Sequence, residues 1–213
     1  MARVVNRDNY DNEIAYMEEH GYSTIAGVDE VGRGPLAGPV VVASVIMPHD
    51  HFIEGIKDSK KVSEKKREEL YDVIRENAIE YKIVFIDHDV IDDINILNAT
   101  KRGMVEAIEG LETITDITLV DGNDIHLGTA KPIEYVVKGD MKSYSIGAAS
   151  ILAKVARDRL MREYESVYPS YEFAKNKGYG TATHIAAIKE NGPCPIHRLS
   201  FIKNFVGGNK DNE

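Results

Sequence analysis

Two adjacent carboxylates, Asp29 and Glu30, run directly into a glycine-rich segment with one arginine, in the string GVDEVGRGPLAGP. Short apolar runs at 24–28 and 40–47 flank this segment and predict strands, and its glycines and prolines predict a turn. Carboxylate oxygens and bare backbone N–H groups at a strand end suit cations and phosphates. The string therefore predicts an active site.

Asp29 and Glu30 also raise a geometric difficulty. Neighbouring residues of a regular strand point to opposite faces of the sheet, so these two side chains cannot both face one site without a local change. We expect a strand end or a bulge at this point.

Two further carboxylates follow apolar runs. Asp121 comes directly after ITLV at 117–120, and Asp140 comes after IEYVV at 133–137 and a Lys-Gly pair. In open α/β sheets the site lies at such strand ends. Four oxygen ligands with no nearby Cys and no paired His favour Mg²⁺ or Mn²⁺ over zinc. Two such ions about 4 Å apart are the usual device for displacement at a phosphodiester.

Asp158 is a competitor for the place given to Asp140. It lies four residues after Lys154 in a helical pattern, where an ion pair between the two is the simpler interpretation. We therefore assign the fourth carboxylate to Asp140.

The elements that must position these carboxylates alternate between strands and helices. Strands are expected at 24–28, 40–47, 82–86, 117–120 and 133–137, and helices at 8–20, 63–81, 90–111, 143–168 and 183–190. The first two strands are close enough to form an antiparallel hairpin, and 117–120 has the short apolar character of a buried parallel strand. We divide the chain into a catalytic core at 1–169, whose first helix is a minor packing element, and an extension at 170–213 packed on it.

The composition and net charge of the chain limit the classes of function that are possible. The 213 residues, 43% hydrophobic and 29% charged, are typical of one globular domain. A net charge of −9 argues against broad nonspecific adhesion to nucleic acid, although it leaves room for a local basic groove. The chain has no apolar run long enough to span a bilayer and no secretion signal, so we expect a cytoplasmic protein with no membrane partner. A single cysteine, Cys194, allows no intrachain disulfide and is assigned no chemistry.

Five strings in a fixed order closely resemble the bacterial ribonuclease HII family. The strings read GVDEVGRGPLAGPVV, DSKKVSEKKREEL, LVDG, KGDMKSYSIGAASILAKVARD and NKGYGT, and the resemblance as a whole covers most of residues 25–205. The resemblance implies a ribonuclease H-like α/β fold, with a mixed sheet of five strands and helices on both faces. It also implies hydrolysis on the 5′ side of ribonucleotides, in RNA:DNA hybrids and at single ribonucleotides in duplex DNA, leaving a 3′-OH and a 5′-phosphate. In that reading Asp29, Glu30, Asp121 and Asp140 hold two Mn²⁺ or Mg²⁺ ions and water is the nucleophile.

The resemblance also assigns residues to the substrate. Gly32, Arg33 and Gly34 match the element that contacts the 2′-OH at the RNA–DNA junction in the family. This is chemically sensible, because only the 2′-OH distinguishes RNA from DNA at one position and glycines let the backbone approach it. Tyr179 matches the tyrosine that packs on the following deoxyribose.

Phosphate contacts are expected from the basic run that precedes the second helix. Ser59, Lys60 and Lys61 are assigned to this role, which fixes register without reading sequence. The rest of the run has the interleaved acids of a solvated helix face.

Three residues near the C-terminus, His184, His197 and Arg198, are given no chemical role. The chain is expected to act as a monomer on nucleic acid. Two alternatives stay open: a related polynucleotidyl transferase such as a junction resolvase, and a hybrid-binding protein without catalysis.

Overall fold

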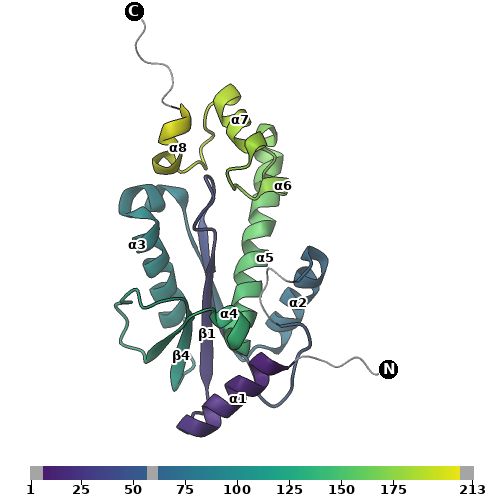
Figure 1. The fold of residues 1–213 in the computed structure, drawn as a ribbon, viewed down its shortest axis with the longest axis vertical. Helices are drawn as coiled ribbons and strands as arrows, with labels where there is room; N and C mark the ends of the chain where they lie inside the picture. Colours follow the sequence, from purple (N-terminus) through teal and green to yellow (C-terminus); the bar gives the residue numbers. More distant parts are fainter. Residues whose placement is uncertain (1–6, 57–61, 207–213) are drawn as a thin grey trace, which may run out of the picture.

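The computed structural model describes residues 7–56 and 62–206 (Figure 1). Its helices are α1 Asp8–His20, α2 Glu64–Asn77, α3 His88–Glu109, α4 Gly139–Lys142, α5 Tyr144–Val167, α6 Phe173–Asn176, α7 Ala182–Asn191 and α8 Leu199–Val206, with a 3-10 turn at Pro169–Tyr171. Its strands are β1 Ile25–Val31, β2 Val40–Ile46, β3 Glu80–Ile86, β4 Ile117–Asp121 and β5 Ile133–Val136.

The five strands form one mixed sheet in the order β3-β2-β1-β4-β5. β1 pairs antiparallel with β2, and β2 with β3, whereas β1–β4 and β4–β5 are parallel pairs. The predicted mixed sheet and its opening hairpin are confirmed. β1 lies at the centre, with an antiparallel neighbour on one side and a parallel neighbour on the other.

Helices cover both faces of the sheet, as expected, and β2 shows why. All seven of its residues are buried. Val41, Ala43 and Val45 belong to the core with α2 and α5, while Val40 and Val42 belong to the core with α3. Strand side chains alternate between faces, so a continuous apolar strand needs cover on both. Figure 1 shows the sheet between α3 and α5.

Some strand and helix boundaries differ from those expected from the sequence, because hydrogen bonds extend or cap the element. β1 runs to Val31, three residues beyond the expected end, because its pairing with β2 continues to Val31↔Val41. α5 begins at Tyr144, where the Ser143 hydroxyl accepts the Ile146 N–H at 3.1 Å and caps the helix. The short helix α4 was not predicted.

The C-terminal elements pack together beyond the tip of β1, around the last turns of α5 (Figure 1). Their apolar cluster contains Tyr171, Phe173, Ile188, Ile196 and Ile202, together with Ala37 of the β1–β2 connection and Met161 of α5. The division of the chain near residue 169 stays a prediction, but the later segment clearly buries the connection that carries the glycine-rich string.

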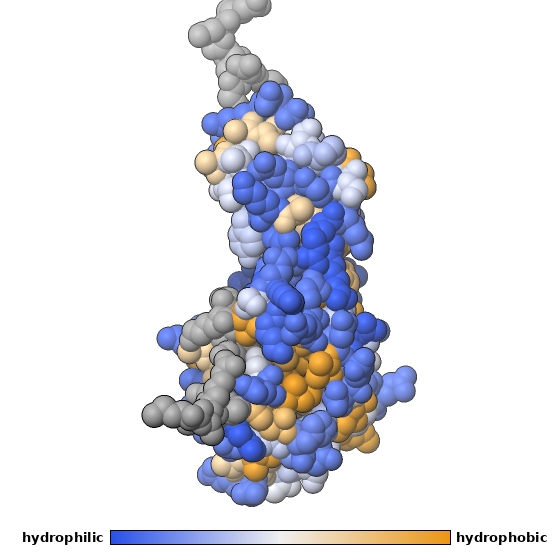
Figure 2. Space-filling model, turned by 90° about the vertical axis from the view of Figure 1, so that its right-hand side faces the viewer, coloured by the Kyte–Doolittle hydropathy of each residue, from blue (hydrophilic) through white to orange (hydrophobic). Residues whose placement is uncertain are grey.

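Seen from the side of α2, the upper part of the molecule is mostly hydrophilic, and a group of hydrophobic residues is exposed lower on the same face (Figure 2). Among the described residues, none of the helices combines the length and the apolar character needed to cross a bilayer.

Candidate active site

Asp29 lies on β1 at the point where the long helix α5 crosses it. Gly27, two residues earlier, permits this crossing, because a Cβ there would lie 2.1 Å from the backbone carbonyl carbon of Ser145. Asp29 is buried; its Oδ1 accepts the Glu30 N–H at 2.7 Å, and its carboxylate also accepts a hydrogen bond from Ser150 of α5. The Ser150 hydroxyl is a part of the site that the sequence reasoning missed.

Asp121 is the last residue of β4, the parallel neighbour of β1. The pairing of these strands ends at Val28↔Val120, so Asp29 and Asp121 are the next residues along each strand. Side chains in register on parallel strands share a face, which places both carboxylates on the α5 side of the sheet. Asp121 Oδ1 accepts the Gly139 N–H at 2.6 Å. This bond brings the start of α4, with the buried Asp140, against the end of β4.

Burial and mutual charge repulsion both raise the pKa values within this group. Burial raises the pKa of Asp29 well above its ordinary value, and the charges of Glu30 and Asp121 raise it further. Burial likewise raises the pKa of Glu30, although the Arg33 guanidinium opposes that shift. Carboxylates that repel one another in a buried site are the environment that a bound cation relieves.

Glu30 corrects one expectation. β1 passes regularly through Asp29 and Glu30, paired with Ala43 and Val42 of β2, so the predicted strand end or bulge is wrong. Strand alternation places Glu30 on the α3 side, opposite to Asp29. Its longer side chain still meets Arg33, whose Nη1 lies 3.2 Å from Glu30 Oε1.

Asp29, Glu30 and Asp121 are neighbours, and Asp140 lies in the helix that Gly139 joins to Asp121, but these carboxylates do not form a ligand shell. Among the described residues, no three His, Cys, Asp or Glu side chains are arranged to hold one metal ion. The contacts explain this, because Glu30 is paired with Arg33 and one oxygen of Asp121 is engaged by Gly139. The donor set, all carboxylate oxygen, nevertheless fits Mg²⁺ or Mn²⁺.

The Gly-Arg-Gly element follows β1 directly, so it adjoins the carboxylates. Gly32 has φ 93°, a conformation that side chains disfavour, and a Cβ there would lie 2.3 Å from Arg157 Nε. The Arg33 side chain is half-exposed. A Cβ on Gly34 would lie 3.7 Å from Tyr179 Cε1, so the structure brings the predicted tyrosine, 42% exposed, beside this element.

Two further predictions concern Asp158 and the basic run before α2. Asp158 accepts from Lys154 Nζ at 2.7 Å, which is the ion pair expected for it. Ser59, Lys60 and Lys61 lie outside the described residues.

The C-terminal histidines form a buried chain of hydrogen bonds. His184 Nε2 lies 3.1 Å from His197 Nε2, and His184 Nδ1 lies 2.9 Å from the Tyr179 carbonyl oxygen. The Cys194 N–H donates to His197 Nδ1 at 2.9 Å. With both rings neutral, His197 donates to His184 and His184 donates to Tyr179, so the chain supports the tyrosine backbone.

Comparison with known proteins decides the family. A family model described as Ribonuclease HII matches residues 26–204. The chain belongs to the ribonuclease HII family. It is therefore a ribonuclease, an enzyme that hydrolyses phosphodiesters.

Relatives agree in sequence and in fold. Ribonuclease HII of Ruminiclostridium cellulolyticum is 58% identical over 186 residues, which are 87% of this chain and 72% of the relative. Ribonuclease HII of Caldicellulosiruptor saccharolyticus is 52% identical over 199 residues, covering 93% of this chain and 97% of the relative. The crystal structure of ribonuclease H2 from Pyrococcus horikoshii superposes with a TM-score of 0.74 at 26% identity, covering 87% of this chain and 98% of that one. The ribonuclease H-like fold is thereby confirmed.

Proposed function

We propose that the chain is an endoribonuclease that hydrolyses the phosphodiester on the 5′ side of ribonucleotides, in RNA:DNA hybrids and at single ribonucleotides within duplex DNA. The products are a 3′-OH and a 5′-phosphate. One observation carries the proposal: Asp29 and Glu30 in the last paired residues of β1, with Asp121 at the end of β4 beside them, closely precede the backbone of Gly32, Arg33 and Gly34, with Tyr179 next to it. A site for phosphodiester chemistry thus continues into a surface suited to recognising one nucleotide.

A divalent metal fits the carboxylates, and Asp29, Glu30, Asp121 and Asp140 are the residues that would hold it. The support is the mutual repulsion that raises the pKa of Asp29 and Glu30. Bound Mg²⁺ or Mn²⁺ would supply an activated water and charge stabilisation at the leaving oxygen. The protein contributes the fixed geometry: Ser150 and the Glu30 N–H orient Asp29, and the Gly139 N–H orients Asp121.

Selection of a ribonucleotide would come from the backbone of the Gly-Arg-Gly element. The 2′-OH is both a donor and an acceptor, so it can be recognised by backbone groups that approach closely. The exposed Gly34 leaves room for that approach, whereas the missing side chain of Gly32 lets Arg157 pack directly beneath the element. Tyr179 would then pack on the neighbouring deoxyribose. All of these residues come from one chain, and we propose that a monomer is competent.

The test is a duplex with one embedded ribonucleotide, incubated with Mg²⁺ or Mn²⁺ and compared with the same duplex made only of DNA. We expect a single cut on the 5′ side of the ribonucleotide and none in the all-DNA duplex. Binding without any cut would favour the hybrid-binding alternative, and cutting of branched DNA alone would favour a resolvase.

Asp121→Asn tests the carboxylates within that assay. Loss of a ligand charge should lower the cleavage rate by at least about a hundredfold, since even the outer partners of metal ligands cost 10–100-fold. Asp124→Asn is the matched control, because Asp124 lies in the same connection and its side chain is 54% exposed. Full activity of Asp121→Asn would remove this residue from the site.

A further inference from the structure

Arg198, which had no role predicted from the sequence, donates hydrogen bonds to the backbone of the Gly-Arg-Gly element. It lies directly before α8, 166 residues away from Gly32, and is fully buried. Its Nη2 donates to the Gly32 carbonyl at 2.6 Å, its Nη1 to the Arg33 carbonyl at 3.0 Å and its Nε to the Gly38 carbonyl at 2.9 Å. One guanidinium therefore fixes three peptide groups of the β1–β2 connection.

Because peptide groups are planar, these hydrogen bonds also determine where the N–H groups of the Gly-Arg-Gly element point. In a trans peptide the C=O of one residue and the N–H of the next point in opposite directions. With the carbonyls of Gly32 and Arg33 turned in toward Arg198, the N–H groups of Arg33 and Gly34 point away from it. In the described part of the chain, the backbone hydrogen bonds include none donated by either group. No described residue accepts a hydrogen bond from either N–H group, so both are available to a bound ligand.

Arg157 of α5 also donates hydrogen bonds to the β1–β2 connection, at residues other than those that Arg198 contacts. Its Nε and Nη2 donate to the carbonyls of Pro39 and Ala37 at 2.9 and 3.1 Å. Its Nη1 donates to the Lys177 carbonyl at 2.8 Å, two residues before Tyr179. The same guanidinium thus joins the β1–β2 connection to the segment that carries the tyrosine, so the two expected substrate contacts move as one unit.

The charge of the pair also fits a nucleic acid. Among the described residues, neither guanidinium has a carboxylate within ion-pair distance, although both are buried. Burial lowers the pKa of Arg198 to about 9 and that of Arg157 to about 10, so both remain charged at neutral pH. Two buried positive charges beneath the Gly-Arg-Gly element favour an anionic backbone above it.

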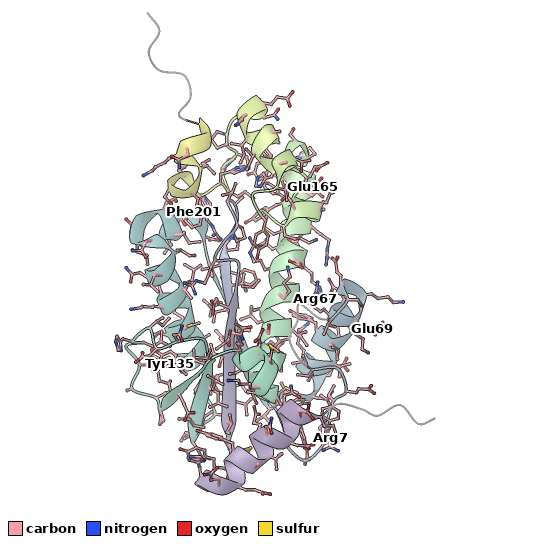
Figure 3. All side chains as sticks on the ribbon, viewed as in Figure 1. Arg7, Arg67, Glu69, Tyr135, Glu165 and Phe201 are labelled. Carbon is pink, nitrogen blue, oxygen red and sulfur yellow. The ribbon has the colours of Figure 1, made fainter. Side chains whose placement is uncertain are left out.

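Two contacts outside the element hold Arg198 itself in place. Its guanidinium stacks on Phe201, 5.2 Å from the ring centroid, and Figure 3 shows Phe201 where α8 approaches α3. The Asp92 carboxylate of α3 accepts the N–H groups of Leu199 and Ser200 at 2.7 and 3.0 Å. The first turn of α8 is therefore anchored to α3.

We propose that Arg198 is a positioning residue for ribonucleotide selection, which turns the carbonyls of Gly32 and Arg33 inward so that the Arg33 and Gly34 N–H groups face the 2′-OH. This inference rests on the proposed function. Lysine cannot replace arginine here, because a single ammonium nitrogen cannot reach three carbonyls that a planar guanidinium spans. The substitution keeps a basic side chain of similar length and removes the planar guanidinium that reaches the three carbonyls.

The experiment compares Arg198→Lys with the unaltered protein in two measurements. The first is the ratio of the dissociation constant for an all-DNA duplex to that for the same duplex with one ribonucleotide, measured in Ca²⁺. The second is the Mn²⁺ concentration that gives half-maximal cleavage. We expect the ratio to fall roughly tenfold, as for the loss of about one good hydrogen bond, with the Mn²⁺ requirement unchanged. Arg102→Lys, in an exposed ion pair of α3, is the control.

Each outcome has a distinct meaning. A lower folded fraction alone would reduce activity on every substrate without changing the ratio, so a changed ratio separates positioning from stability. A high ratio retained by Arg198→Lys overturns the inference and leaves the proposed function standing. A ratio near one for the unaltered protein contradicts the proposed function and this inference together.

Asp92→Asn keeps the inference testable if Arg198→Lys does not fold. It weakens the anchor of α8 without altering any arginine, so the ratio should fall in the same direction by a smaller factor. An unchanged ratio in Asp92→Asn would then count against the proposal.

Discussion

At the scale of single residues, the carboxylates of the site repel one another, and a bound cation would reduce this repulsion. Asp29 is buried beside Glu30 and Asp121, and its pKa is raised by burial and by both charges. A group whose pKa is raised on folding destabilises the fold whenever it is ionised. The residue proposed for catalysis is therefore one whose charge costs stability in the absence of metal.

Asp29→Asn should accordingly be inactive and more stable than the unaltered protein in EDTA. The amide keeps an oxygen for the Glu30 N–H and removes the charge. A gain of about 1 kcal/mol would raise the melting temperature by roughly 2–4 °C for a chain of this size. Thermal unfolding followed by circular dichroism is the measurement. A lower melting temperature in EDTA would contradict the account of repulsion.

Added Mn²⁺ should raise the melting temperature of the unaltered protein and leave that of Asp29→Asn nearly unchanged. A ligand that binds only the folded state stabilises it by about 2.7 kcal/mol at a hundred times its dissociation constant. The same thermal scans with and without metal check this. Equal shifts in both proteins would place the metal elsewhere.

At the scale of elements, α1 does more than the minor packing expected of it. Its buried Glu13 accepts hydrogen bonds from His49 Nε2 at 2.7 Å, from the Ser145 N–H at 3.0 Å and from the Ser143 hydroxyl. Burial opposes ionisation, yet these donors hold the pKa of Glu13 below its ordinary value. Ser143 also caps α5, so α1 is fastened to the junction between α4 and α5, close to Asp140.

Glu13→Ala should therefore destabilise the protein by about 3–5 kcal/mol, the usual cost of removing one partner from a buried charged network. Glu13→Gln should cost less, because it keeps the volume and one acceptor oxygen. Urea unfolding measures both, with Glu18→Ala on the exposed face of α1 as the control. A cost for Glu13→Ala no larger than that of the control would show that the network contributes little.

At the scale of the whole molecule, the C-terminal elements act as a second support for the site. α8 carries Arg198 to the Gly-Arg-Gly element, and the histidine pair links Cys194 to the Tyr179 carbonyl. Burial lowers the pKa of His197 to about 4, and the charge of His184 contributes in the same direction. Burial also lowers the pKa of His184. Both rings are neutral in the folded protein at pH 7.

The contribution of the histidines to stability should therefore fall as the pH falls from about 6.5 toward 4, whereas Asp29, with its raised pKa, contributes in the opposite direction. In this window the unfolded histidine, with its ordinary pKa of 6.5, binds a proton that folded His197 does not. The slope is up to about 1.4 kcal/mol per pH unit for each such group. His197→Gln, which can donate and accept in the same place, should flatten the dependence between pH 6.5 and 5. Equal slopes in urea unfolding of the two proteins would contradict the assignment.

The sequence by itself determined the five strands and the five longer helices, and it predicted the members of the site. Apolar runs such as ITLV and the residues of β2 identify strands because a buried strand has few other compositions, and carboxylates that end such runs must meet at the sheet edge. Asp29, Asp121 and the Gly-Arg-Gly element could be placed together on that ground. The regular course of β1 through Glu30 could not, because pairing with β2 overrides the local expectation of a bulge.

Only the tertiary structure decided what holds these residues in position. Ser150, Glu13, Arg157 and Arg198 act through hydrogen bonds to residues as many as 166 positions away, and no local period or motif indicates such a partner. A buried arginine in the sequence is indistinguishable from a surface one until the fold brings carbonyl groups to it. The residues proposed for the chemistry of this protein can thus be identified from short sequence motifs. Their geometry depends on contacts that exist only after the chain has folded.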